Sequence, residues 1–320
     1  MSKIICIVAG DPNSINSELI FKSWKKLDYK IRKKIVLIGN YELIKEQKRK
    51  LNFQINLKQI EKISENNNSN LLKIINVPLK FNDCFNVQRK QASRYVVKSL
   101  NLAHDLCQKK EIPGFINCPI EKILIKKRGI HGVTEFLGKK KLSNNFSEVM
   151  LLHNKKLSVT PITTHIKIKD ISRNLKKSVV INKIKTIVVY FKKLFKKKPY
   201  VAVLGLNPHN SELDKNSEEV KIIIPAIKKL RSYCKIEGPK IADNFFKNEY
   251  KKYNVIVGMY HDQVLIPFKN FFRYDAINIT LGLDYIRVSP DHGTAKDIIF
   301  KNKGNTKSLI ECIKFINKLR

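Results

Sequence analysis

Short apolar runs alternate along the chain with longer segments of mixed polarity. Runs rich in β-branched residues and bounded by Gly, Pro or Asn are typical of buried strands. The pattern predicts strands over Ile4–Val8, Ile35–Ile38, Gly114–Cys118, Val149–His153, Leu157–Ile162, Val201–Leu206, Val255–Met259 and Ala276–Thr280. Strands that alternate with helical segments in this way indicate an α/β fold with a largely parallel sheet.

Three segments carry the spacing of amphipathic helices. Residues 92–108 place apolar side chains on one face: Tyr95, Val96, Leu100, Ala103 and Leu106. Residues 217–234 begin at a potential N-cap, Ser217, and contain Pro225, which predicts a kink or a late start.

The third segment, residues 174–200, is cationic and amphipathic. Such a helix could lie on a membrane surface or on nucleic acid. Its apolar stripe is continuous at helical spacing and leads directly into a strand, which favours a helix that packs inward: Val180, Ile184, Ile187, Val188, Phe191 and Phe195.

The composition excludes several classes of protein. A hydrophobic content of 43% argues against disorder, and the longest apolar runs fall well short of the ~20 residues that span a bilayer. The six cysteines form no C-x-x-C pair, so neither a disulfide framework nor a thiolate zinc site is expected. The N-terminal stretch "MSKIICIVAGDP" lacks the design of a signal peptide, and we expect a cytoplasmic protein.

The formal charge of +36 has two readings. An excess of Lys and Arg suits a nucleic-acid-binding protein. However, Lys far outnumbers Arg, and Ile and Asn are also abundant, as expected from A/T-rich codons alone. We favour codon bias as the origin of the charge.

Three histidines follow three different predicted strands. His165 ends "VTPITTH", His209 lies in "GLNPHNSE" after "YVAVL", and His261 ends "NVIVGMYH". Ligands gather beyond the carboxyl ends of parallel strands, so these side chains could meet in one crevice. Three neutral imidazoles suit Zn²⁺, Co²⁺ or Ni²⁺ and leave a coordination position open.

Further polar groups accompany the histidines. Lys269 follows His261 after an apolar spacer, Asn278 interrupts the apolar run "INITLGL", and Arg287 lies between apolar neighbours in "YIRVSPDHGTA". Cations near a metal crevice indicate a substrate that carries phosphate or carboxylate.

The motifs "GVTEF", "TTHI", "GLNPHNSE", "MYHDQVLIPFK" and "INITLGLDYIRVSPDHGTA" together resemble those of the 4-hydroxythreonine-4-phosphate dehydrogenase family of pyridoxal phosphate biosynthesis, in the family's order. The resemblance implies a two-domain α/β/α fold like isocitrate and isopropylmalate dehydrogenases, with the active-site cleft between the domains. We expect residues 1–125 and 270–320 to form the cofactor-side domain, and residues 126–269 the metal, substrate and dimerisation domain.

The resemblance also implies the site residues. A divalent metal (Zn, Mg or Co) would be held by His165, His209 and His261, shared between the subunits of a homodimer. Substrate contacts fall on Thr134, Lys269, Asn278 and Arg287. The segment that would hold NAD or NADP comprises Asp291, His292, Gly293, Thr294 and Ala295, which would explain the missing G-x-G-x-x-G fingerprint. Asp243, Asp262 and Lys269 are the candidate catalytic residues, with Asp243 and Asp262 unranked for proton transfer or for orienting a ligand histidine.

The implied reaction is NAD(P)-dependent oxidation of 4-phosphooxy-L-threonine to 2-amino-3-oxo-4-phosphooxybutanoate, which decarboxylates to 3-amino-2-oxopropyl phosphate. One alternative is a relative that oxidises another phosphorylated hydroxy acid, such as erythronate or threonate 4-phosphate. The other is a decayed enzyme or a basic nucleic-acid-binding protein. We expect a small phosphorylated substrate, and neither nucleic acid nor a membrane as partner.

The chain departs from the family pattern at several positions. Val133 stands where the family has a histidine that contacts substrate, and His131 lies two residues earlier. Glu121 replaces another histidine, and the first turn, "GDPNSINSE", has lost glycines. These changes bear on the activity and on the exact substrate.

Overall fold

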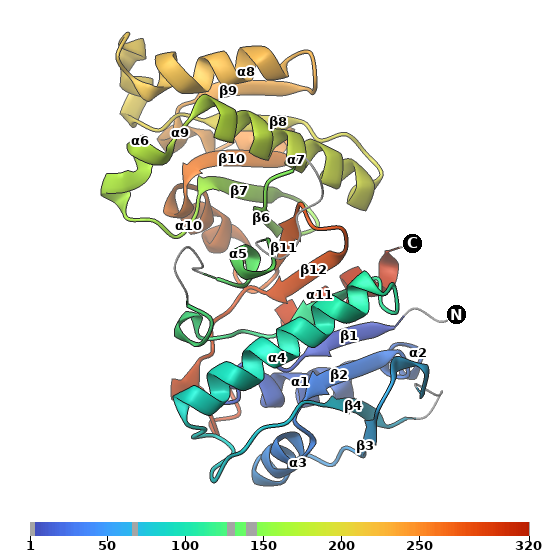
Figure 1. The fold of residues 1–320 in the computed structure, drawn as a ribbon. Helices are drawn as coiled ribbons and strands as arrows, with labels where there is room; N and C mark the ends of the chain where they lie inside the picture. Colours follow the sequence, from blue (N-terminus) through green and yellow to red (C-terminus); the bar gives the residue numbers. More distant parts are fainter. Residues whose placement is uncertain (1–3, 66–69, 127–131, 139–145, 320) are drawn as a thin grey trace. The chain divides into compact units, whose positions relative to one another are not determined.

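A computed structural model describes residues 4–65, 70–126, 132–138 and 146–319 of the chain. The chain forms two compact units, residues 1–137 with 285–320 and residues 138–284 (Figure 1). The sequence predicted a cofactor-side domain of residues 1–125 and 270–320, and a metal, substrate and dimerisation domain of residues 126–269. This assignment of roles stays a prediction.

The first unit is built on parallel strands in the order β3-β4-β2-β1-β5-β12. These strands are β1 (Ile5–Val8), β2 (Ile35–Gly39), β3 (Leu57–Ile60), β4 (Leu72–Asn76), β5 (Gly114–Asn117) and β12 (Ile286–Pro290). Its helices are α1 (Asn16–Lys26), α2 (Tyr29–Arg32), α3 (Tyr41–Lys50), α4 (Arg89–Gln108), α5 (Val133–Gly138, which ends one residue into the second unit) and α11 (Lys307–Lys318).

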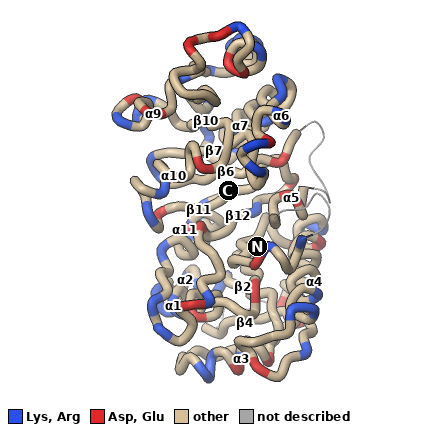
Figure 2. The backbone as a smooth tube through the Cα atoms, turned by 90° about the vertical axis from the view of Figure 1, so that its left-hand side faces the viewer, with Lys and Arg blue, Asp and Glu red and all other residues tan. Residues whose placement is uncertain are grey.

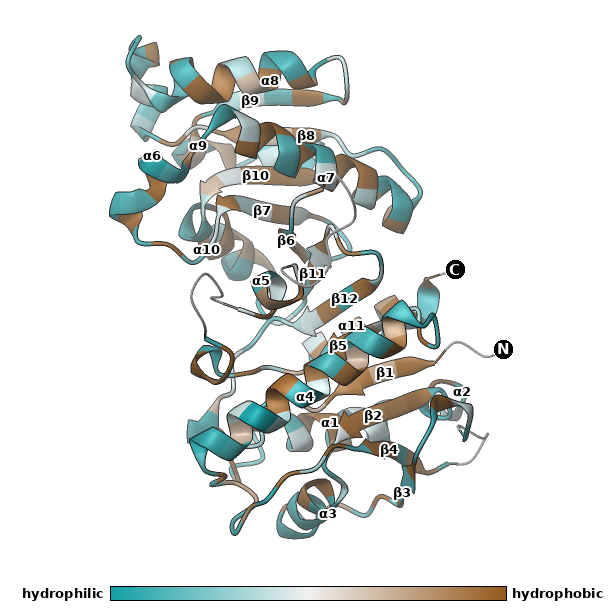
Figure 3. Ribbon diagram, viewed as in Figure 1, coloured by the Kyte–Doolittle hydropathy of each residue, from teal (hydrophilic) through white to brown (hydrophobic). Residues whose placement is uncertain are grey.

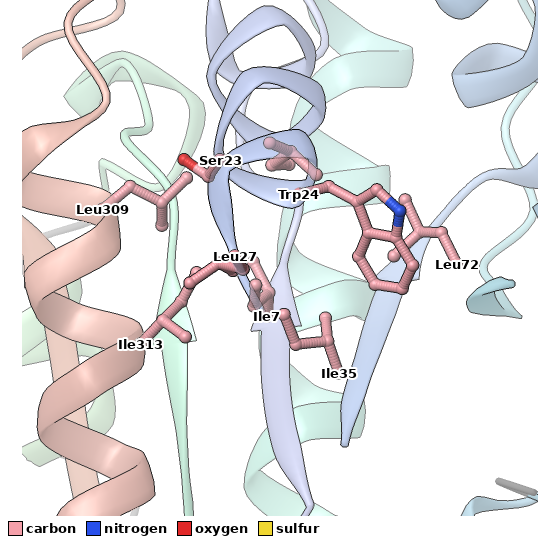
Figure 4. Close-up of a pocket in the computed structure, with 9 residues that line it drawn as sticks. Ile7, Ser23, Trp24, Leu27, Ile35, Leu72, Leu309 and Ile313 are labelled. Atoms are coloured by element: carbon pink, nitrogen blue, oxygen red, sulfur yellow. The ribbon is translucent and has the colours of Figure 1, made fainter. Parts of the chain in front are cut away.

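Helices cover both faces of this first sheet. Helix α4 packs on one face and buries the five apolar side chains predicted for it, and α1 and α11 pack on the other (Figures 1 and 4). Apolar side chains from α1, α11 and the strands line a small pocket there, among them Trp24, Ile35 and Ile313. This apolar packing holds the helices against the sheet.

The second unit is also α/β, with strand order β11-β6-β7-β10-β8-β9. The strands are β6 (Val149–His153), β7 (Ser158–Thr163), β8 (Val201–Leu204), β9 (Ile236–Lys240), β10 (Val255–Tyr260) and β11 (Ile277–Leu281). β6 runs antiparallel to β7 and β11, whereas β7, β10, β8 and β9 are parallel. The helices are α6 (Ile171–Asn174), α7 (Lys177–Phe195), α8 (Ile224–Leu230), α9 (Ala242–Phe245) and α10 (His261–Phe272).

The mixed α/β fold predicted from the apolar pattern is confirmed. Each predicted strand is present with ends shifted by at most two residues, whereas β3, β4, β9 and β12 were missed. β4 carries a fully buried Lys73 as its second residue, and β9 contains Gly238-Pro239, which normally marks a turn. The helix does not start late at Pro225: a π-helical turn over Glu219–Ile223 runs directly into α8, so helical structure begins before the proline and only the regular α-helical turns begin beside it.

Helix α7 packs inward, as its stripe predicted. Five members of the predicted stripe are buried and Phe195 is half-buried, while Lys177, Lys192 and Lys193 are exposed; the buried ones are Val180, Ile184, Ile187, Val188 and Phe191. Figure 3 shows the same division in both units, with brown strands and mixed brown and teal helices. Among the described residues, no helix combines the length and the apolar character needed to cross a membrane.

Lys and Arg are spread over helices and loops of both units (Figure 2). The lysines of α7, for example, leave its buried stripe apolar. Most of the high charge is therefore carried by solvated positions around an ordinary apolar core, with Lys73 and Arg287 as buried exceptions.

We predict that Gly114→Ala destabilises the first unit. A Cβ at this position would overlap the carbonyl oxygen of Ile286, its partner in the pairing of β5 with β12. The expected loss of unfolding free energy is about 1 to 3 kcal/mol, measured by denaturant titration. Gly293→Ala is the control, because a Cβ there meets no atom within 4 Å; equal stability of the two variants would contradict the prediction.

We predict that stability falls in strong acid partly through Glu237 on β9. Hydrogen bonds donated by the hydroxyls of Tyr200 and Tyr253 hold the pKa of Glu237 at about 2, below its ordinary value. A lowered folded-state pKa stabilises the fold above the unfolded pKa, and this contribution is lost as pH falls through about 2. In Glu237→Gln the decline of the melting temperature between pH 5 and pH 2 should be shallower than in the unaltered protein, by a small amount because the carboxylate is partly exposed. Identical declines would contradict this role.

Candidate active site

Three neighbouring parallel strands carry the segments that bear the histidines. β7, β10 and β8 lie side by side in this order, and each is followed by one histidine. His165 comes two residues after β7, His261 is the first residue of α10 directly after β10, and His209 lies in the turn Pro208–Leu213 after β8. Because the strands are parallel, all three segments leave the same edge of the sheet.

His165 and His261 form a close pair at this edge. Their ring centroids lie 5.6 Å apart, near the roughly 5 Å expected for two imidazoles on one tetrahedral ion. The Nδ1 of His261 lies 2.7 Å from the Asp262 carboxylate. A carboxylate partner at Nδ1 leaves Nε2 as the metal-binding nitrogen, so this pair fits a divalent ion.

His209 does not join this pair within the described part of one chain. Across the described residues, no group of three or more His, Cys, Asp or Glu side chains comes together closely enough to hold a metal ion. His209 is exposed, and its backbone is left-handed, with φ of 49°. The three-histidine site therefore stays a prediction, with the third ligand expected from the partner subunit.

Gln263 joins the His209 segment to the helix of His261. Its amide nitrogen donates to the Gly205 carbonyl at 2.7 Å, and its oxygen accepts from Met259 N at 2.7 Å. Gly205 has no room for a side chain, since a Cβ would overlap the Asn210 amide. The position of Gln263 directly after His261-Asp262 was visible in the sequence. Its hydrogen bonds to the ends of two strands were not.

The other predicted residues of the second unit lie on separate elements. Asp243 is exposed on α9, which packs against the turn of His209. Lys269 is exposed on α10, about two turns beyond His261. Asn278 on β11 has a buried side-chain oxygen that lacks a hydrogen-bond partner among the described residues, as expected of a group that binds a ligand.

In the first unit the structure brings Arg287 and Thr134 together. Arg287, on β12, is 3% exposed; its Nε donates to Asn117 Oδ1 at 2.5 Å and one of its terminal nitrogens donates to Thr134 Oγ1 at 3.4 Å. Burial lowers the pKa of Arg287 to about 10, so the guanidinium stays charged at neutral pH. Asn117 was missed by sequence reasoning, although a polar residue ending a buried strand was a signal.

The segment Asp291–Ala295 follows β12 and lies against the first βα turn. Ile15 N donates to the Thr294 carbonyl at 3.1 Å, and Asp291 N donates to Ser308 Oγ at 2.9 Å. A Cβ on Gly293 would meet no atom within 4 Å, so a bound group could approach the backbone here. These features fit the predicted nicotinamide-cofactor segment.

The residues that depart from the family motifs lie in different structural environments. Val133 begins α5 and is half-buried, directly before Thr134. Glu121 pairs with Lys296 at 2.5 Å, next to the predicted cofactor segment. His131 lies outside the described residues.

The fold defines the class first. The chain is similar to isocitrate dehydrogenase from Methylococcus capsulatus, with a TM-score of 0.50 and 11% identity over 99% of this chain and 85% of that one. This likeness shows the fold alone. It confirms the expected isocitrate-dehydrogenase-like α/β class.

The family follows from closer relatives. Residues 31–316 match the family described as "Pyridoxal phosphate biosynthetic protein PdxA", and the chain belongs to this family. It is 35% identical to 4-hydroxythreonine-4-phosphate dehydrogenase from Aquifex aeolicus over 100% of this chain and 99% of that one. It is 30% identical to D-threonate 4-phosphate dehydrogenase from Salmonella typhimurium over 99% of each.

A solved structure supports the same assignment. That of 4-hydroxythreonine-4-phosphate dehydrogenase from Klebsiella pneumoniae matches with a TM-score of 0.83 and 27% identity, over 100% of this chain and 98% of that one. The resemblance inferred from the motifs is thus confirmed at the level of the family.

We predict that Asn117→Leu destabilises the chain because it removes the acceptor of the shorter hydrogen bond from the buried Arg287 guanidinium. A buried charge that loses a hydrogen bond costs about 2 to 4 kcal/mol. Thr134→Val, which removes the longer 3.4 Å contact, should cost less than about 1 kcal/mol. Denaturant unfolding measures both, and the reverse order would show that Asn117 does not stabilise Arg287.

Proposed function

We propose that this protein oxidises 4-phosphooxy-L-threonine with NAD or NADP and so forms 2-amino-3-oxo-4-phosphooxybutanoate. The secondary alcohol loses its hydroxyl proton and a hydride, and the hydride passes to the nicotinamide. The resulting β-keto acid then loses CO₂ to give 3-amino-2-oxopropyl phosphate. This reaction would serve pyridoxal phosphate synthesis.

One observation carries the proposal most strongly. Two histidines from neighbouring strand ends stand as a pair in a chain of this family, with a carboxylate at the Nδ1 of one of them. This donor set suits a divalent ion such as Zn²⁺, Mg²⁺ or Co²⁺, with His209 of a second copy as the third ligand. We therefore also propose a homodimer with shared sites.

The chain's own residues have separate roles in the proposed mechanism. Arg287 and Lys269 offset the negative charge of the phosphate and carboxylate, and Thr134 and Asn278 hydrogen-bond the substrate. Asp291–Ala295 would hold the nicotinamide cofactor. When bound, the ion lowers the pKa of the substrate hydroxyl and the nicotinamide accepts the hydride.

The proton of the hydroxyl needs an acceptor. Asp243 and Asp262 are the candidates in the second unit, and both are exposed. Asp262 already bonds His261 at 2.7 Å, which favours it as the residue that orients this histidine and leaves Asp243 for proton transfer.

A second candidate substrate is D-threonate 4-phosphate. Relatives named for this activity are 30% identical over nearly the whole chain. Val133, half-buried beside Thr134, lacks the imidazole that the family places there, so the substrate contacts near the Arg287 cluster differ from the family pattern. Parallel assays with both phosphorylated acids distinguish the two functions.

We predict that the purified protein forms NADH or NADPH from 4-phosphooxy-L-threonine and loses this activity on treatment with a chelator. Restoring a divalent metal should restore turnover. The measurement is absorbance at 340 nm with each cofactor. Chelator-resistant turnover would rule out the metal role, and salt-sensitive DNA binding without dehydrogenase activity would favour a basic nucleic-acid-binding protein instead.

His209→Ala provides the sharper test of the third ligand. Loss of one of three metal ligands should reduce turnover by at least ~100-fold with an unchanged melting temperature, because His209 is exposed. Asn248→Ala, at an exposed position before the turn Glu249–Lys252, is the control and should keep full activity. Unchanged turnover in His209→Ala would exclude the proposed ligand.

A further inference from the structure

The segment that carries His209 has an unusual backbone. His209, Asn210, Ser211, Glu212 and Leu213 are consecutive residues with positive φ, between 47° and 58°. Left-handed geometry costs a residue with a side chain about 1 kcal/mol or more. A run of this kind persists only where surrounding contacts hold it.

Glu219, in the π-helical turn before α8, contacts the residues directly ahead of this run. One carboxylate oxygen accepts from Leu206 N at 2.7 Å and from Asn207 N at 2.8 Å, and the other accepts from the Asn207 side-chain amide at 2.9 Å. The residue is fully buried, at 0% exposed. Through these three hydrogen bonds the buried Glu219 side chain fixes residues 206 and 207 against the helical turn.

The residues that Glu219 binds lie close to His209 along the chain. Only Pro208 separates Asn207 from His209, and its ring fixes one of the intervening torsions. The orientation of the peptides at residues 206 and 207 therefore largely determines the position and direction of the His209 backbone. A neighbouring acid, Glu218, also accepts from the Asn207 amide at 2.9 Å, which steadies the same side chain.

We propose that Glu219 is a positioning residue that presents His209 to the divalent metal. This inference rests on the proposed function, namely on His209 as a ligand. Glu219 acts through the backbone amides of residues 206 and 207, and it touches neither substrate nor metal. The two oxygens of its carboxyl group accept all three hydrogen bonds, which the single oxygen of an amide side chain could not do.

The test is a titration of the metal-free protein with Co²⁺, followed by the visible absorption of the bound ion. Glu219→Leu keeps the approximate volume and removes every acceptor, so we expect cobalt affinity to fall at least ~10-fold and the cobalt spectrum to change, with the unaltered protein as reference. Glu219→Gln keeps one oxygen for the two backbone amides and should lose only a few-fold in affinity.

Glu18→Leu is the matched control. Glu18 is 2% exposed and accepts from Gly304 N at 3.0 Å and Lys22 Nζ at 2.6 Å, but it lies in the first unit, away from the histidine segments in the sequence. It should lower the melting temperature as Glu219→Leu does, while cobalt affinity stays within about twofold of the unaltered protein.

The outcomes separate this inference from the proposed reaction. If cobalt binding follows the expected order but no substrate is oxidised, the reaction is wrong and the positioning role stands. Equal cobalt affinity in Glu219→Leu and the unaltered protein would overturn the role. So would an equal loss in Glu18→Leu, a loss seen only together with a changed oligomeric state, or no cobalt binding by the unaltered protein.

Discussion

The parallel hydrogen bonding of β7, β10 and β8 is the constraint on which the candidate site depends. Because these strands run in one direction, the segments after them leave a single edge of the second unit's sheet. Residues separated by about fifty positions in the sequence, such as His209 and His261, thereby reach the same region without any local motif. The antiparallel strand β6 lies outside this set and ends with His153, which lies 2.8 Å from Ser158 Oγ and packs against the Phe195 ring, and whose pKa burial lowers to about 4.

Hydrogen bonds of polar side chains fix the specific geometry within this general alignment. Gln263 joins the end of β8 to the start of α10, and the Asn117 side chain holds the guanidinium of Arg287. Each of these side chains would be costly to bury alone, so each stabilises the chain only in the arrangement that satisfies its partner. Gln263 and Asn117, which have no proposed role in the reaction, thus hold predicted site residues in place.

The departures from the family motifs lie outside the three predicted metal-binding histidines. Glu121, where the sequence departs from the family motif, forms an ion pair with Lys296 at 2.5 Å. Val133 is half-buried directly before Thr134, and its aliphatic side chain cannot make a hydrogen bond. The abundant surface lysines, in contrast, change the charge of the protein while its apolar core remains ordinary.

The sequence by itself determined the α/β class, the buried strands and the inward face of α7, because apolar periodicity reports burial directly. Its motifs also identified the family. The sequence could not indicate β9, whose Gly-Pro pair reads as a turn, or the buried Lys73 within β4, because their environments depend on neighbouring strands distant in the chain. Only the tertiary structure decided that β7, β10 and β8 are neighbours, that His165 and His261 pair, and that Glu219 binds the backbone amides of residues 206 and 207. These are long-range contacts, and strand order and side-chain partners arise from packing that no local pattern encodes.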